Sequence, residues 1–143
     1  MKNALLYSAF FLFHSLQMLL AQPAAFSPRG VGGGGALFFP TINPANDQEF
    51  YISCDMSQLF HSIDFGDTYE QLPFNALQVF NRSTYEFTNN PNVAYSIFND
   101  GNDGYPVKTA DGGQHWSSLP GYDVGQYGAA YKLVANYENP NQL

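Results

Sequence analysis

The sequence predicts an all-β fold made of repeated antiparallel sheets, and three observations lead to this prediction. A short motif occurs twice: residues 62–69 and residues 109–116, 47 positions apart, both read Ser/Thr-x-Asp-x-Gly-x-x-aromatic. Two dipeptides repeat at the same offset, namely Asn43-Pro44 with Asn90-Pro91 and Leu72-Pro73 with Leu119-Pro120. The composition, with 17% aromatic and only 12% charged residues, favours strands and turns over helices.

A repeat of this length, made of short β segments, is typical of β-propeller blades. We therefore expect an incomplete propeller with two four-stranded blades and the first strand of a third. A third Asn-Pro, at residues 139–140, follows the second after 49 positions. The expected units are a signal peptide (1–21), a leader (22–31), blade one (32–83), blade two (84–126) and the truncated start of blade three (127–143). Residues 43–73 and 90–120 are expected to superpose without gaps.

The expected strands follow from the apolar and β-branched runs between turn signals. In blade one they are residues 36–43, 49–53, 58–63 and 68–72, and in blade two residues 84–88, 93–98, 105–109 and 115–118. Residues 127–136 are expected to open blade three. The long connections, residues 75–83 and 121–125, are where a propeller carries variable surface chemistry.

The repeated motif suits the tip of a β-hairpin. Its Asp can accept backbone N–H groups a few residues ahead, its Gly allows a positive φ, and its aromatic side chain folds back over the turn. The motif residues are therefore expected to be structural: Ser62, Asp64, Gly66, Tyr69, Thr109, Asp111, Gly113 and Trp116.

This motif resembles the Asp-box, or bacterial neuraminidase repeat. The first expected blade resembles the opening blade of secreted, two-propeller glycoside hydrolases of the xyloglucanase type. The resemblance rests on the Gly run 32–35, Pro40, Asn43-Pro44 and Tyr51-x-x-Cys54-Asp55-Met56. The resemblance implies that Asp55 is one of two catalytic carboxylates and that the other lies in a later propeller, outside this chain. Sortilin-type receptor propellers share the repeat without hydrolysis.

The first 21 residues have the plan of a signal peptide, with one charge at Lys2, an apolar run over residues 4–20 and the small Ala21 at its end. We expect a secreted protein, periplasmic or extracellular, without a stable membrane span after cleavage. The single cysteine, Cys54, lies in a strand-like run, and such a free cysteine is usually buried.

The charge pattern argues against a nucleic-acid partner, because five basic residues stand against twelve acidic ones and they do not cluster. No group of His, Cys and carboxylate residues has the spacing of a metal site, so neither a metal nor a cofactor is expected. The Gly run 32–35 lacks the Lys-Ser/Thr of a phosphate-binding loop, and residues 100–104 fit an Asp-Gly turn better than a calcium loop.

Three functions stay open. In the first, the chain is the N-terminal part of a secreted, glycoside hydrolase-like propeller that acts on a polysaccharide or glycan. This part alone is expected to be inactive, because the downstream blades are missing. Alternatively, it is a non-catalytic propeller that binds proteins or glycans, or a two-blade lectin that oligomerises into a ring. Sialidase ranks lower, because Arg29 and Arg82 are the only arginines. A glycosidase needs two carboxylates. The nearest second candidate, Asp103, is one residue off the repeat position of Asp55.

Overall fold

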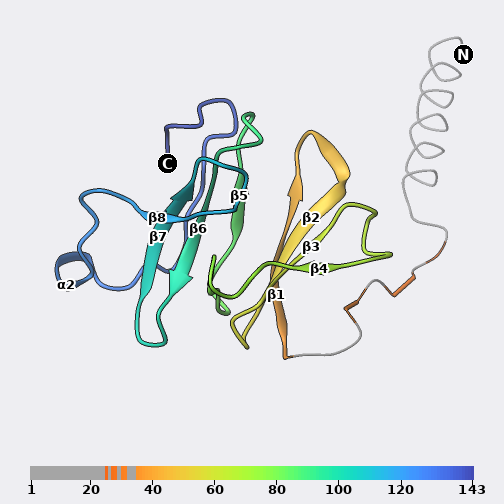
Figure 1. Ribbon diagram of the computed structural model, residues 1–143, viewed down its shortest axis with the longest axis horizontal. Coiled ribbons are helices and arrows are strands. Elements are labelled where there is room, and N and C mark those ends of the chain that lie inside the picture. Colours follow the sequence, from red (N-terminus) through yellow and green to blue (C-terminus); the bar gives the residue numbers. More distant parts are fainter. Residues whose placement is uncertain (1–24, 26, 29, 32–34) are drawn as a thin grey trace, which may run out of the picture.

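The chain folds mostly as β-sheet: two open, four-stranded antiparallel sheets lie next to each other (Figure 1). A computed structural model describes residues 25, 27–28, 30–31 and 35–143. The predicted signal peptide and residues 32–34 of the Gly run lie outside these described residues.

Each sheet is a simple meander in which consecutive strands are neighbours. The first contains β1 (Leu37–Asn43), β2 (Asn46–Cys54), β3 (Leu59–Ser62) and β4 (Glu70–Gln71). The second contains β5 (Tyr85–Phe87), β6 (Ala94–Asn99), β7 (Gly104–Thr109) and β8 (Ser117–Ser118). The prediction of two four-stranded antiparallel sheets is thus confirmed, whereas their closure into a propeller is not part of what is observed.

The core lies between the two sheets. Side chains alternate along β2, so that Tyr51 and Ser53 are buried on the face toward the second sheet, while Phe50 and Ile52 are half-buried on the other face. The ring of Tyr51 stacks on Tyr85 of β5. The buried apolar cluster comprises Tyr51, Leu59, Leu77, Val79, Tyr85, Ala94 and Val107.

The linker between the sheets, residues 72–84, supplies the other wall of this core. Leu77 and Val79 are almost fully buried. The Val79 N–H donates to the Ser57 carbonyl at 3.3 Å, and the Asn99 N–H donates to the Gln78 carbonyl at 2.9 Å. Because Ser57 follows β2 and Asn99 ends β6, the linker joins the β2–β3 and β6–β7 hairpin tips at one end of the molecule.

Buried serines lock the linker to both sheets. The Ser83 hydroxyl donates to the Ile97 carbonyl at 2.6 Å, and the Ser53 hydroxyl donates to the Ser83 carbonyl at 2.9 Å. Both side chains are at most 1% exposed. The two buried hydroxyl groups therefore have hydrogen-bond partners in place of water, and these bonds hold one sheet in position against the other.

The two sheets differ in register, so the prediction of a gapless superposition of residues 43–73 on 90–120 is wrong. Tyr51 pairs with His61, and Tyr95 pairs with Lys108. His61 and Lys108 are 47 positions apart, but the two tyrosines are only 44 apart. Measured from these pairs, the β6–β7 hairpin is therefore three residues longer than the β2–β3 hairpin. The loops do not account for this, because residues 55–58 and 100–103 are four residues each; instead, β6 and β7 pair at six positions and β2 and β3 at four.

The predicted opening strand at residues 127–136 is not formed. Its first residue, Tyr127, ends a four-residue helix, α2 (Val124–Tyr127), and residues 128–143 contain no strand. The segment lies on a face of the second sheet, where Leu133 packs with Tyr95 and Ile97. Its Ala130 N–H reaches the Gly104 carbonyl at 2.9 Å. A strand requires a ladder with a neighbouring strand, and here the segment packs mainly through side chains.

Candidate functional site

The first repeated motif forms a closed hydrogen-bonded turn between β3 and β4. The Ser62 hydroxyl accepts the Gly66 N–H at 2.7 Å and donates to Asp64 Oδ1 at 2.9 Å. Asp64 also accepts both the backbone N–H and the hydroxyl of Thr68, at 2.8 and 2.6 Å. These bonds favour the carboxylate, and the Thr68 hydroxyl is the main reason that the pKa of Asp64 lies below its ordinary value.

The second motif forms the same turn between β7 and β8. Thr109 accepts the Gly113 N–H at 2.9 Å and donates to Asp111 Oδ1 at 2.9 Å. The His115 backbone N–H and its Nδ1 contact the two oxygens of Asp111 at 2.9 and 2.6 Å. The backbone N–H bond, followed by the His115 side chain, lowers the pKa of Asp111 to about 2.

Both turns place their Gly and aromatic residues in matching roles. Gly66 and Gly113 have φ of 85° and 91°, a region that favours glycine. Tyr69 packs edge-on against Phe50, and Trp116 packs edge-on against Tyr85, at 5.8 and 5.9 Å. In both motifs, the Ser/Thr hydroxyl and the Asp carboxylate form hydrogen bonds inside the turn.

The three Asn-Pro dipeptides also share one bond. In each, the Asn side-chain oxygen accepts the N–H of the residue two positions on: Asn43 from Ala45 at 2.9 Å, Asn90 from Asn92 at 3.0 Å, and Asn139 from Asn141 at 3.2 Å. This is an Asx turn, which an Asn before Pro readily adopts. The repeat therefore reaches residue 141 in its turn chemistry, although no strand precedes the third copy.

Asp55, the candidate catalytic carboxylate, lies in the turn from β2 to β3 and is half-buried. Its N–H donates to the Ala36 carbonyl at 3.2 Å. The Sγ of Cys54, fully buried as expected, is 3.6 Å from Asp55 Oδ1. A Cβ added to Gly35 would lie 1.9 Å from this same oxygen. A side chain at residue 35 would therefore have to displace this carboxylate.

Asp55 and Asp103, the two candidate carboxylates, lie in different hairpin tips. Asp103 is held in its own hairpin tip, where its N–H donates to Asp100 Oδ1 at 2.8 Å. No hydrogen bond joins Asp55 to Asp103 within the described part of the chain. Over the same residues, no three His, Cys, Asp or Glu side chains gather as metal ligands.

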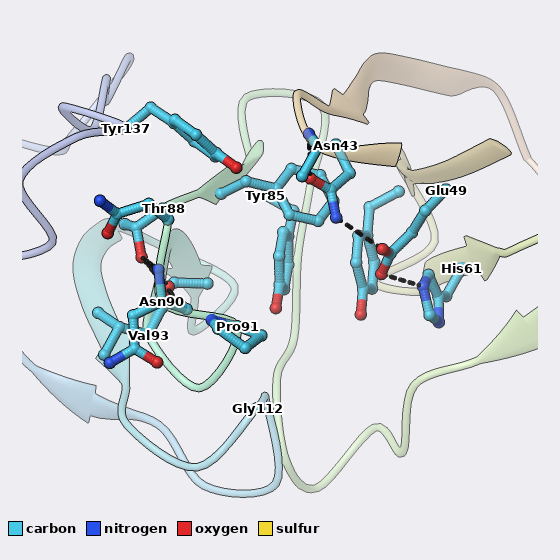
Figure 2. Close-up of a pocket in the computed structure, with 15 residues that line it drawn as sticks. Asn43, Glu49, His61, Tyr85, Thr88, Asn90, Pro91, Val93, Gly112 and Tyr137 are labelled. Atoms are coloured by element: carbon cyan, nitrogen blue, oxygen red, sulfur yellow. Dashed lines mark hydrogen bonds and ion pairs between the residues drawn. The ribbon is translucent and has the colours of Figure 1, made fainter. Parts of the chain in front are cut away.

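A different group of polar residues meets in a pocket of about 400 Å³ between the two sheets, which we call the intersheet pocket (Figure 2). Glu49 and Tyr51 of β2 and His61 of β3 line it from the first sheet. Tyr85 of β5 lines it from the second, and Tyr137 lines it from the C-terminal segment. The pocket thus depends on both sheets and on the segment that follows them.

Three polar side chains form a continuous line along the first-sheet wall. Asn43 Nδ2 donates to Glu49 Oε2 at 2.7 Å, and Glu49 Oε1 lies 3.0 Å from His61 Nε2 (Figure 2). The side chains of Glu49 and His61 keep 23% and 20% of their surface exposed. The carboxylate and the imidazole are therefore fixed in position and still reachable from solvent.

Stacked rings form the floor beside this line. Tyr51 lies between His61 and Tyr85, with ring centroids 4.1 and 3.7 Å away and planes within 11° of parallel. Burial raises the pKa of Tyr85 to about 12, and burial raises the pKa of Tyr51 further. Both phenols are therefore neutral at physiological pH and can donate as well as accept hydrogen bonds.

Sequence reasoning missed the intersheet pocket. Glu49 and His61 carry no motif, and they meet only because Tyr51 pairs with His61 and Glu49 lies two positions before Tyr51 on the same face. The signal that could have found them is this alternation, once the register was known. None of the eight predicted Asp-turn residues lines the pocket, whereas Asn43, Asn90 and Pro91 of the repeated Asn-Pro dipeptides do.

No protein-family model matches this chain, and neither a curated protein nor a solved structure matches it significantly. Of the helices in the described residues, none has the length and apolar character needed to cross a membrane.

Proposed function

We propose that this chain forms two blades of a secreted β-propeller and that its intersheet pocket binds a saccharide unit of a glycan. The blade assignment is supported by the two meanders, by the identical bonding of the two Asp turns and by the three matching Asn-Pro turns. Burial of Tyr51 and Tyr85 between the sheets is the packing by which one repeat covers the next.

The line of Asn43, Glu49 and His61 beside stacked aromatic rings is the observation on which the glycan proposal rests. A sugar presents hydroxyl groups around its edge and C–H groups on its faces. The carboxylate and the imidazole can bond the hydroxyls, while the half-buried rings of Phe87 and Tyr137, which also line the pocket, can cover an apolar face. A pocket of about 400 Å³ is within the usual range for small-molecule sites.

Binding is favoured over hydrolysis at this position. Glycoside hydrolysis uses two carboxyl groups on opposite sides of the scissile bond. Within the described residues, Glu49 is the one carboxylate that lines the intersheet pocket. The pocket can therefore orient a sugar but lacks the acid-and-base pair.

The test is a titration of the protein with neutral oligosaccharides of β-glucan and xyloglucan, followed by calorimetry and by NMR. We expect saturable binding with shifted signals from His61 and Tyr85. Glu49→Gln should weaken binding at least about tenfold, because it removes the charged acceptor. Glu138→Gln, the same change at an exposed site, should leave affinity unchanged. Equal affinity in all three proteins, or no binding of any sugar, would refute the proposal.

A second candidate function is hydrolysis at Asp55 in a longer protein. One observation favours it: Asp55 lies at the open hairpin-tip end, with Gly35 packed directly against its carboxylate. Such close approach of backbone marks positions where a side chain would block a site. The partner carboxylate would have to come from outside this chain.

A further inference from the structure

A second pocket, of about 260 Å³, lies at the hairpin-tip end of the sheets and shares no residue with the intersheet pocket. Ser57 borders it from the β2–β3 tip, Asn99 and Asn102 border it from the β6–β7 hairpin, and Arg82 borders it from the linker. Ala129 and Ala130 complete its wall. We call it the Arg82 pocket.

Arg82 is held in place without an anionic partner. Its guanidinium carbon lies 4.1 Å from the centroid of the Tyr131 ring, so the side chain is stacked on the C-terminal segment. No carboxylate of the described residues forms an ion pair with it. In a protein with twelve acidic and five basic residues, such an arginine is available for a ligand.

The nearby acidic residues do not neutralise this charge. Asp100 turns one carboxylate oxygen into its own hairpin, where Oδ1 accepts the N–H groups of Asn102 and Asp103 at 2.9 and 2.8 Å. These bonds, the one from Asp103 first, lower the pKa of Asp100. Neither Asp55, Asp100 nor Asp103 lines the Arg82 pocket.

Amide groups add neutral donors next to the guanidinium. Asn99 uses its side-chain oxygen to accept the Gly101 N–H at 2.7 Å, which orients the amide. Its Nδ2 and the amide of Asn102 make no hydrogen bond within the described residues. The pocket is therefore lined by the guanidinium of Arg82 and by two side-chain amides. These hydrogen-bond donors suit a ligand that carries a carboxylate with adjacent hydroxyls.

We propose that the Arg82 pocket binds the carboxylate of an acidic sugar, a uronic acid residue of a polysaccharide. The planar guanidinium of Arg82 would form a bidentate pair with the two carboxylate oxygens, and the amides of Asn99 and Asn102 would hydrogen-bond the neighbouring hydroxyls. This inference rests on the proposed glycan-binding function and names a class of glycan for it. It assigns a charge preference that the intersheet pocket alone does not provide.

The test uses ¹⁵N-labelled protein and the Nε–Hε signal of Arg82, with D-glucuronate, D-glucose and acetate as probes. Glucuronate should shift this signal saturably, while glucose at the same concentrations should not. Acetate should bind at least about tenfold more weakly than glucuronate, because it lacks the hydroxyls that the amides would bond. Equal affinity for acetate and glucuronate would overturn the assignment to a sugar.

Variants of Arg82 distinguish the effect of its bidentate hydrogen bonding from the effect of its positive charge. In the variants, binding is followed through the amide signals of Asn99 and Asn102, which line the same pocket. Arg82→Gln should abolish their shift with glucuronate, and Arg82→Lys should weaken the affinity about tenfold, because a lysine keeps the charge but loses the bidentate geometry. Lys132→Gln removes a charge next to Tyr131 in the chain and outside the pocket lining, and the affinity of this variant should stay within about twofold of the original protein.

The two proposals fail in different ways. If neutral oligosaccharides still shift His61 and Tyr85 but glucuronate leaves Arg82 unmoved, the uronate inference is wrong and the glycan-binding function stands. If glucuronate shifts Arg82 and no neutral sugar binds, the intersheet proposal is wrong. If Lys132→Gln lowers the affinity as much as Arg82→Gln, the attraction is non-specific and the Arg82 pocket is refuted.

Discussion

The ring of Tyr51 in the first sheet stacks on the ring of Tyr85 in the second, with centroids 3.7 Å apart and planes 11° apart. Tyr85 also meets Phe87 and Trp116 at 4.9 and 5.9 Å. One tyrosine thus connects the first sheet to the aromatic side chain of the second Asp turn. The two sheets are expected to fold as a single cooperative unit for this reason.

Replacing Tyr85 with alanine should therefore unfold both sheets together. We expect the free energy of unfolding to fall by about 3–5 kcal/mol, the usual cost of deleting a large buried aromatic side chain. The measurement is chemical denaturation followed by both fluorescence and circular dichroism. Tyr127→Ala, at a residue that is 60% exposed, is the control and should change little. Separate transitions for the two signals would contradict a shared core.

Alkaline pH should destabilise the protein through the same pair of tyrosines. The pKa of Tyr85 rises from 10.0 to about 12, and that of Tyr51 rises too, in both cases chiefly by burial. The neutral phenol is thus favoured by folding. Its contribution is complete below pH 10 and is lost as the pH rises to about 12 and beyond.

The measurement is phenolate absorbance together with stability over this pH range. Exposed tyrosines should titrate first, and the buried pair should titrate only with unfolding. Tyr85→Phe keeps the ring and should flatten the decline in stability between pH 10 and 12. If all ten tyrosines ionise in one step near pH 10 while the protein stays folded, the burial of this pair is not what we describe.

Acid should act on the second Asp turn. The pKa of Asp111 falls from 3.8 to about 2, chiefly through the backbone N–H of His115. A lowered pKa means that the turn contributes stability above pH 3.8, and that this stability is lost as the pH falls toward 2. Asp111→Asn should lower the melting temperature at pH 7 and remove this part of the acid dependence. Asp47→Asn, at the exposed start of β2, should leave the pH profile unchanged; identical profiles for both variants would count against the turn.

Asp55 and Asp111 should respond oppositely if the longer protein hydrolyses a β-glucan. Asp55→Asn should keep the melting temperature but lower turnover about 10²–10⁴-fold, as expected when an essential carboxylate is removed. Asp111→Ala should lower the melting temperature and keep turnover per folded molecule. Near-normal turnover in Asp55→Asn would return Asp55 to the role of a turn residue.

Self-association should occur through the face of the first sheet turned away from the second. Ile42 pairs with Phe50, and Ile52 pairs with Phe60, so these four apolar side chains share that face and stay at least partly exposed. Ile42→Glu should reduce oligomers in sedimentation experiments. Val134→Glu, on the C-terminal segment, is the matched control. A monodisperse, unmodified protein would show that this face needs no partner.

Local turn chemistry was predictable from sequence, and strand register was not. The Asp turns follow from residues only two to four positions apart, such as Ser62 with Asp64 and Gly66, so their motif contains all that is needed. Cys54 could be assigned to a buried strand by the same local reasoning. The order of strands in both meanders also followed from the spacing of the turns.

Glu49 and His61 show what local patterns leave out. Their contact depends on the register between β2 and β3, and the corresponding β6–β7 hairpin of the second sheet is three residues longer. The constant offset of 47 hid this difference, because the β3 and β7 halves keep it while β2 and β6 do not. Residues 128–136 have a strand-like composition, but the segment forms no strand. Instead, Leu133 is buried against Tyr95 and Ile97 on the second sheet.

The unequal hairpins suggest where this scaffold can be diversified. The bonds of each Asp turn involve no residue of the opposite end of its hairpin. The three extra residues of the β6–β7 hairpin therefore leave Thr109, Asp111 and Gly113 bonded as in the shorter copy. Loops that lie away from the anchoring contacts tolerate insertions best. Peptides grafted between Gly101 and Asn102 should accordingly be accommodated, and recognition at that end can change without redesign of the sheets.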